Sequence, residues 1–263
     1  MVRRDQIVDA LTAALRDVAW VRAAYLGGSD ATGRTDEWSD VDVVALVEDD
    51  RTEESFRVVR DALTALSPIA HSYRMPEPTF HGGSQEFYRL RDADPCHIVD
   101  YVAMRLSQED RLLEPERHGT PHVLFDRDGL LRPTPLDRAA LNAKMRARLE
   151  EMRSVFYVFQ SLSTKAVHRG HPGEAVVRLQ QMTLKPLVDL LRIRYCPDRW
   201  DFGFRYLDRD LPDAVRRDFE ALLLPRNLDQ VEEHRARAEA MFTENLRALD
   251  AGEWSLPDRS GPE

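Results

Sequence analysis

Hydrophobic residues in the first half of the chain follow two different spacings. Over residues 4–18 they recur at three- and four-residue steps, which predicts a helix with one buried face. Residues 21–26 form a short apolar run that stops at a glycine pair, as a buried strand before a tight turn does. Residues 41–47 are continuously apolar apart from one acid near the start, which predicts a central strand, and residues 53–66 return to helical spacing.

The order of the later elements predicts two domains. Strand patterns at 86–90 and 97–104 complete an N-terminal domain with a mixed sheet over residues 1–132, and we expect residues 117–128 to form its exit. From residue 133 the apolar stripes are helical, and we expect helices over 141–166, 174–195 with a kink at Pro186, 212–223 and 227–249. The predicted class is therefore α+β: an α/β-type domain, then a helical bundle over 133–256 and a flexible tail over 257–263.

Composition narrows the classes of partner. The chain has 43% hydrophobic and 32% charged residues, as globular proteins do, and a net charge of −9 that argues against gripping a nucleic acid. No apolar run approaches the roughly 20 residues that a bilayer requires, so we expect no membrane partner. We expect no secretory signal and, with two cysteines, no disulfide framework, which together favour a cytoplasmic location.

The candidate chemistry begins with two acids beside the strand at 41–47. Side chains alternate along a strand, so Asp40 and Asp42 project to one side, about 7 Å apart along the backbone. Two carboxylates placed together among valines repel each other unless a cation neutralises them. Oxygen ligands without a His and Cys cluster favour Mg²⁺, or Mn²⁺, over Zn²⁺.

A glycine turn and a third acid extend this candidate site. Gly28 lets backbone amides approach a phosphate closely, Ser29 adds a hydroxyl donor, and a helix starting there would also favour an anion. Asp100 lies in the apolar strand pattern at 97–104 and supplies a third carboxylate. Three such acids could hold two ions about 3.5–4 Å apart. A site of this kind could help a hydroxyl group that accepts a transferred phosphoryl group to lose its proton.

Each feature also has an ordinary explanation. A Gly-Ser pair punctuates many loops, an Asp-x-Asp pair is common on wet strand edges, and Asp100 fits a core acid paired with arginine. Their combined spacing favours the metal site. Glu174 is either a helix-start acid or an acceptor-side base, and Lys165 and Arg205 are either surface charges or triphosphate contacts.

The combined motif resembles the nucleotidyltransferase superfamily of DNA polymerase beta. It consists of Gly28-Ser29, ten intervening residues, Asp40-Val41-Asp42 and a later strand acid, Asp100. The resemblance implies that the turn binds a nucleoside triphosphate, that the three acids bind two Mg²⁺ ions, and that a nucleoside monophosphate passes to a hydroxyl with release of pyrophosphate.

The layout of the chain resembles one subgroup of that superfamily. A small N-terminal domain followed by a helical bundle is similar to the antibiotic adenylyltransferases that modify aminoglycosides and lincosamides. This resemblance implies AMP transfer from ATP to a small-molecule hydroxyl acceptor, with the helical domain over 133–256 binding that acceptor. Two other interpretations stay open: a transferase acting on RNA or protein, and a nucleotide-binding regulatory module without turnover. The sequence leaves the acceptor, the base preference and the oligomeric state undetermined.

Overall fold

The computed structural model describes residues 1–252, so the predicted tail over 257–263 lies outside the described residues. The chain divides into two compact units, Met1–Leu136 and the part from Asp137 onward, whereas the sequence predicts a division between residues 132 and 133. No helix in residues 1–252 combines the length and apolar character needed to cross a bilayer.

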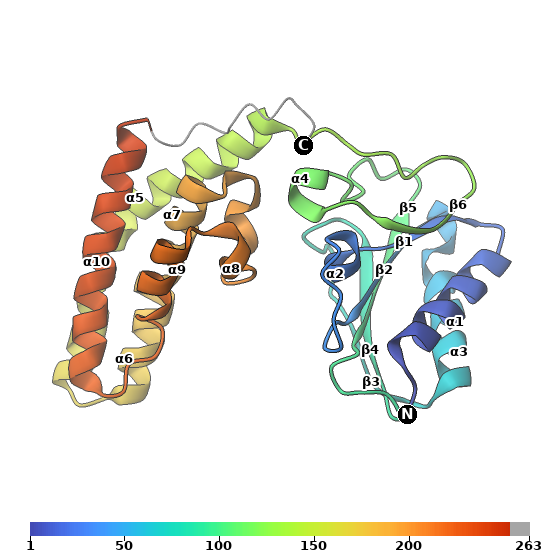
Figure 1. Cartoon of the computed structure of the whole chain (residues 1–263), viewed down its shortest axis with the longest axis horizontal. Coiled ribbons are helices and arrows are strands. Elements are labelled where there is room, and N and C mark those ends of the chain that lie inside the picture. Colours follow the sequence, from blue (N-terminus) through green and yellow to red (C-terminus); the bar gives the residue numbers. More distant parts are fainter. Residues whose placement is uncertain (253–263) are drawn as a thin grey trace. The chain divides into compact units, whose positions relative to one another are not determined.

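The N-terminal unit contains both helices and strands, and its last strand lies at an edge of the sheet (Figure 1). Its elements are α1 (Arg4–Asp17), β1 (Val21–Leu26), α2 (Gly28–Ala31), β2 (Val41–Val47), η1 (Asp49–Arg51), α3 (Thr52–Leu66), β3 (Ile69–Arg74), β4 (Ser84–Leu90), β5 (Val99–Arg105), α4 (Pro115–His118) and β6 (His122–Asp126).

The strands of this unit form one six-stranded mixed sheet in the order β3-β4-β5-β2-β1-β6. β2 and β5 are parallel neighbours at its centre, and the remaining neighbours are antiparallel. Together with the helices that follow in the second unit, this arrangement confirms the predicted α+β class.

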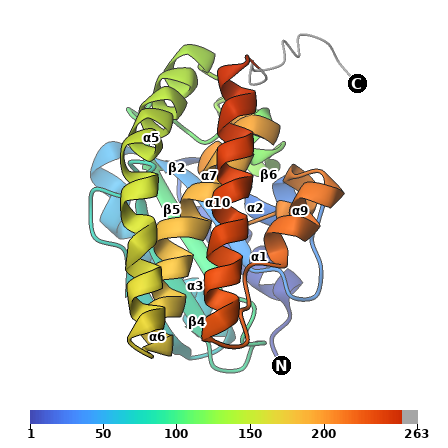
Figure 2. The same ribbon diagram turned by 90° about the vertical axis from the view of Figure 1, so that its left-hand side faces the viewer.

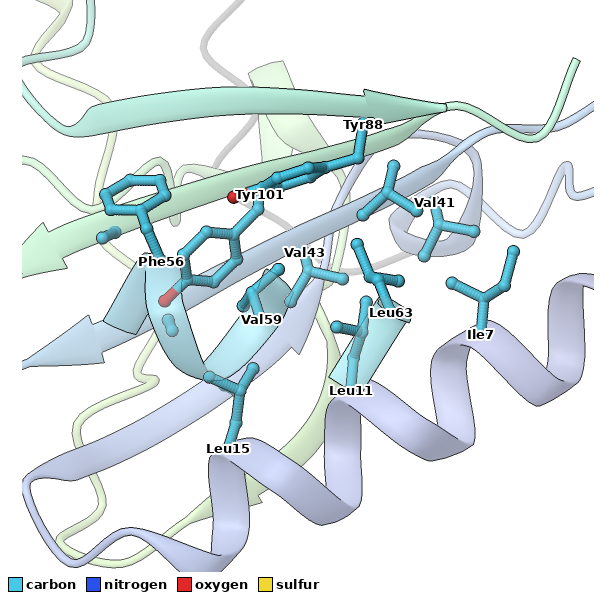
Figure 3. Packing of buried hydrophobic residues seen from close by; sticks show 14 of the residues in the cluster. Ile7, Leu11, Leu15, Val41, Val43, Phe56, Val59, Leu63, Tyr88 and Tyr101 are labelled. Atoms are coloured by element: carbon cyan, nitrogen blue, oxygen red, sulfur yellow. The ribbon is translucent and has the colours of Figure 1, made fainter. Parts of the chain in front are cut away.

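Helices α1 and α3 cover one face of the sheet (Figure 3). The central residues of their apolar stripes are fully buried, as the three- and four-residue spacing predicts, and burial of each large apolar side chain contributes about 1.5–3 kcal/mol. Val41 and Val43 of β2 point into this core, and the Tyr101 ring of β5 meets the Phe56 ring edge-on at 5.1 Å between centroids. The helix residues that form the core are Ile7, Leu11, Leu15, Phe56, Val59 and Leu63.

The opposite face of the sheet is divided along the strand direction. Near the ends of β2 and β5 it carries a smaller apolar cluster that includes Val44, Leu46, Val102 and Met104. Because side chains alternate along a strand, residues 40, 42 and 100 belong to the same face, at the beginnings of the two strands. The face therefore keeps polar side chains at one end without opening the helix-covered core.

Two strands lie where the sequence predicts none. β3 carries mostly exposed residues and pairs only with β4, and β6, within the segment predicted as an exit, pairs only with β1. Edge strands are held by backbone hydrogen bonds on one side and need no buried apolar pattern, so their sequences lack the signal that predicts central strands.

The C-terminal unit is helical in the described residues, and α5, α7 and α10 run side by side (Figure 2). Its elements are α5 (Arg138–His168), α6 (Pro172–Arg178), η2 (Leu179–Leu184), α7 (Lys185–Tyr195), η3 (Pro197–Phe202), α8 (Leu207–Asp210), α9 (Asp213–Glu220) and α10 (Leu228–Asp250).

The predicted kink at Pro186 takes the form of a π-helical turn, η2, directly before α7. Proline has no N–H to donate to the carbonyl of Met182, and Gln160 of α5 donates to that carbonyl instead, at 3.2 Å. Thr183 in turn donates to the Gln160 side chain at 2.7 Å. The irregular turn is thus satisfied by a neighbouring helix.

Candidate active site

The three acids singled out by sequence lie at the beginnings of β2 and β5. Asp42 and Asp100 are direct partners in the parallel register, and Asp40 comes immediately before β2. The pairing extends to that end of the sheet, because the Val41 N–H donates to the carbonyl of Ile98 at 2.8 Å. The structure therefore brings all three acids to one end of one sheet face.

Burial and neighbouring negative charges raise the pKa of all three carboxyl groups, so the folded protein disfavours their ionisation. Burial, followed by the charges of Asp40 and Asp100, raises the pKa of Asp42 to about 7. Burial also raises the pKa of Asp100 and of Asp40, with Arg4 opposing the shift at Asp40. Within residues 1–252 no arginine, lysine or histidine forms an ion pair with any of the three, and the charge of Arg4 offsets the pKa rise of Asp40 and Asp42 only in part.

The glycine turn is built directly against Asp42. Gly28 has a φ of +49°, and a Cβ placed there would lie 1.8 Å from Asp42 Oδ2. The N–H of the preceding residue, Gly27, donates to the Asp42 carbonyl at 2.9 Å. The acid occupies the space that a side chain on the turn would need, so the turn and the acid form one local structure.

Ser29 carries a polar atom that this part of the chain does not satisfy. Its Oγ is buried and has no hydrogen-bond partner in residues 1–252. Leaving such a group unpaired costs about 1–3 kcal/mol, so it is suited to bonding a ligand oxygen. The turn itself is fixed from the other side, because Thr120 donates its N–H to the carbonyl of Ala31 at 2.9 Å.

Arg4 and Asp30 are site residues that the sequence interpretation missed. The Arg4 Nε donates to the carbonyl of Asp40 at 3.0 Å, and its terminal nitrogen pairs with the Asp30 carboxylate. The two side chains are 17% and 12% exposed. Arg4 therefore links the start of α1 both to the backbone at Asp40 and to α2. These contacts join positions that are far apart in the sequence, so no local pattern predicts them.

Asp100 has a different environment from the other two acids. Gln85 Nε2 donates to both of its carboxylate oxygens, at 2.8 and 2.9 Å. As the side chains are arranged, no three His, Cys, Asp or Glu residues within 1–252 stand close enough to hold one metal ion. Asp40 and Asp42, neighbouring oxygen donors whose pKa values are raised, fit a hard divalent cation, while the predicted ion-binding role of Asp100 stays a prediction.

The remaining candidates belong to the C-terminal unit. Glu174 is exposed in the first turn of α6, with its carboxylate 3.7 Å from Arg178, as a helix-start acid would be. Lys165 is exposed on α5, and the Arg205 guanidinium lies over the Phe202 ring, 4.9 Å from its centroid. A contact of these side chains with a triphosphate or acceptor stays a prediction.

Comparison with known proteins gives distant structural neighbours only. No family model matches the sequence, and no curated protein matches it. The structure is similar to an aminoglycoside 6-adenyltransferase from Bacillus subtilis at 13% identity and a TM-score of 0.40, covering 98% of this chain and 94% of that one.

Two cyclic dinucleotide synthases are also among the neighbours. The CdnE c-di-GMP synthase from Capnocytophaga granulosa is 11% identical, with a TM-score of 0.30 and coverage of 94% of this chain and 82% of that one. The CdnE cyclic dinucleotide synthase from Elizabethkingia meningoseptica is 12% identical, with a TM-score of 0.28 and coverage of 94% and 92%. At these values a functional assignment has to rest on the geometry of this chain.

Replacing Gly28 by alanine tests the contact between the turn and Asp42. We expect Gly28→Ala to lower the free energy of unfolding by about 2–3 kcal/mol, since it adds about 1–2 kcal/mol of left-handed strain and displaces the Asp42 side chain. Gly33→Ala is the matched control, because its φ is +64° and nothing lies within 4 Å of the added Cβ. Equal losses in a urea titration of the two variants would contradict the contact.

The raised pKa of Asp42 predicts a pH-dependent difference from its asparagine variant. Between its ordinary value of 3.8 and about 7 the folded state holds a proton that the unfolded state lacks, so wild-type stability falls as pH rises through this window. In chelator-treated protein, Asp42→Asn should match wild type near pH 5 and exceed its free energy of unfolding at pH 8 by at most about 3 kcal/mol, the two pKa units between pH 5 and about 7. Thermal unfolding at both pH values measures this, and a difference that does not change with pH would exclude the shift.

Proposed function

We propose that the chain transfers a nucleoside monophosphate, with AMP from ATP as the first candidate, to a hydroxyl of a small-molecule acceptor and releases pyrophosphate. The observation that carries the proposal is the register of Asp42 with Asp100, beside a glycine turn that Asp42 directly contacts. A cluster of unneutralised carboxyls next to an unsatisfied hydroxyl suits a ligand that brings both cations and phosphate oxygens.

In this proposal the acid pair binds the cation and the glycine turn binds the phosphates. Asp40 and Asp42 would hold Mg²⁺, which when bound offsets the negative charge of the triphosphate and of the departing pyrophosphate. Ser29 would donate its hydroxyl proton to a phosphate oxygen, and Gly28 lets the backbone come close to the phosphates. Arg4 keeps the Asp40 backbone and α2 in place while the ligand binds.

Asp100 would act on the acceptor. Its raised pKa, caused mainly by burial, makes its carboxylate a stronger base than an exposed aspartate. In the reaction the acceptor oxygen forms a bond to the α-phosphorus, the bond from that phosphorus to the bridging oxygen breaks, and pyrophosphate leaves. The hydroxyl proton of the acceptor passes to Asp100.

Charge supports the proposed class of acceptor. A net charge of −9 favours a cationic acceptor, such as an aminoglycoside or a related antibiotic, over RNA. In this proposal the helical C-terminal unit selects the acceptor. A protein acceptor, and a nucleotide-binding module without turnover, are the alternatives that the following experiment separates.

A transfer assay with several acceptors tests the function. The protein is incubated with Mg²⁺, nucleoside triphosphates labelled at the α-phosphate, and separate samples of aminoglycosides, lincosamides, RNA and protein. We expect the label on a small molecule, with stoichiometric pyrophosphate release. Label on RNA or protein would show that the acceptor is a macromolecule and not a small molecule. Tight triphosphate binding without transfer would favour the regulatory module.

Variants at the acid pair separate catalysis from folding. Asp40→Asn and Asp42→Asn should lower kcat by about a thousandfold or more, because several kcal/mol of charge stabilisation is lost, while circular dichroism stays native. Ser29→Ala should mainly raise the KM for triphosphate, by about five- to tenfold, the value of one hydrogen bond. Asp50→Asn, on an exposed side chain of η1, is the control. Wild-type kcat in either acid-pair variant would refute these roles.

A further inference from the structure

A chain of buried polar groups lies behind Asp100. Gln85 in β4 is 6% exposed, and His81 in the preceding loop is also 6% exposed. Neither side chain belongs to the turn or to the acid pair, and the proposed reaction as described above gives them no part. Buried polar groups of this kind are normally fixed by their hydrogen bonds, so the directions of those bonds are informative.

The hydrogen bonds around His81 determine where its ring proton sits. The Gly83 N–H donates to His81 Nδ1 at 3.1 Å, so this nitrogen must carry the lone pair. The other nitrogen, Nε2, lies 3.2 Å from Gln85 Oε1, an oxygen that only accepts. His81 is therefore the Nε2–H tautomer, and it donates to Gln85.

The loop that supplies the Gly83 N–H is itself anchored. The Thr79 hydroxyl donates to the Gly83 carbonyl at 2.5 Å, and it also lies 3.3 Å from His81 Nδ1. Space around the loop is limited, because a Cβ at Gly83 would come within 2.9 Å of Val102 Cγ1. The backbone donor is therefore held opposite the histidine ring.

The donation from His81 fixes the direction of the Gln85 amide. With Oε1 facing histidine, the Gln85 NH₂ group faces Asp100 and contacts its two oxygens at 2.8 and 2.9 Å. A flipped amide would place its oxygen against the carboxylate and would lose the bond to His81. The histidine tautomer thus decides whether Asp100 meets a donor or an acceptor.

We propose that His81 and Gln85 are positioning residues, which hold the Asp100 carboxylate in one orientation for accepting the proton of the acceptor hydroxyl. This inference rests on the proposed function. A single amide nitrogen contacts both carboxylate oxygens, so the end of the Asp100 side chain is held facing Gln85 while the remaining lone pairs of both oxygens stay available. Both residues act on the reaction through Asp100.

Substitutions at His81 separate positioning from packing. His81→Gln keeps a donor N–H where the ring Nε2 stands, whereas His81→Met fills similar space without a donor. His234→Met is the control, since His234 is 7% exposed and its Nδ1 lies 3.0 Å from the Leu222 carbonyl in the C-terminal unit. A purely structural histidine would respond alike to both substitutions.

In the transfer assay we expect His81→Met and Gln85→Met to lower kcat about tenfold or more, as loss of an orienting partner commonly does. The KM for triphosphate should stay within about threefold of wild type, because the turn and the acid pair are untouched. His81→Gln should recover most of the lost kcat, and His234→Met should keep the wild-type value. Wild-type kcat in His81→Met, or equal defects in the glutamine and methionine variants, would overturn the proposal.

Nuclear magnetic resonance gives a readout that needs no turnover. In ¹⁵N-labelled protein the His81 ring should be protonated at Nε2, and in ¹³C-labelled protein the Asp100 carboxyl resonance should move in His81→Met but not in His81→Gln. An Nδ1–H tautomer, or an Asp100 resonance indifferent to both substitutions, would overturn the positioning role. Wild-type protein that shows these signals but transfers no label would instead refute the proposed function.

Discussion

The candidate site depends on one unfavourable arrangement: three carboxyl groups gathered where the central strands begin. Asp42 and Asp100 face the same side because they are paired in the parallel register, and Asp40 is one pleat before Asp42. Burial and the neighbouring charges raise the pKa values of all three carboxyls, which means that the folded protein resists their ionisation. A ligand that carries cations would convert this cost into binding free energy.

The surrounding residues hold the acids without neutralising them. Arg4 reaches the backbone carbonyl of Asp40 and the carboxylate of Asp30, but pairs with neither Asp40 nor Asp42 through their carboxylates. Gln85 is a neutral donor to Asp100. The core that α1 and α3 cover lies on the face of the sheet opposite to the three acids (Figure 3). The core can therefore remain well packed while the three acids stay without an ion pair in the described residues.

The sequence predicts the parts of this site that depend on short spacings. The two-residue period of a strand places Asp40 and Asp42 on one side, and the apolar runs identify β1 and β2, so the turn between them follows directly. The α+β class follows from the order of such runs. The sequence does not predict the pairing of Asp42 with Asp100. The register between β2 and β5 relates strands about sixty residues apart, and no local pattern determines it.

Other features escape sequence analysis for related reasons. Edge strands β3 and β6 carry no apolar alternation, since one side of each has no neighbouring strand. His81 and Gln85 look like ordinary polar residues until the loop and β4 bring them together behind Asp100. The contact of Gly28 with the Asp42 carboxylate likewise requires coordinates, because a Gly-Ser pair on its own indicates only a turn.

A titration with Mn²⁺ and a non-hydrolysable ATP analogue, followed by electron paramagnetic resonance of free Mn²⁺, measures whether the three acids and the glycine turn form one binding site. We expect saturable Mn²⁺ binding that becomes much tighter when the analogue is present, and that is lost in Asp42→Asn while the fold is retained. Mn²⁺ binding of equal affinity in wild type and Asp42→Asn, or none with the analogue present, would contradict a cation and triphosphate site at the crowded carboxyls.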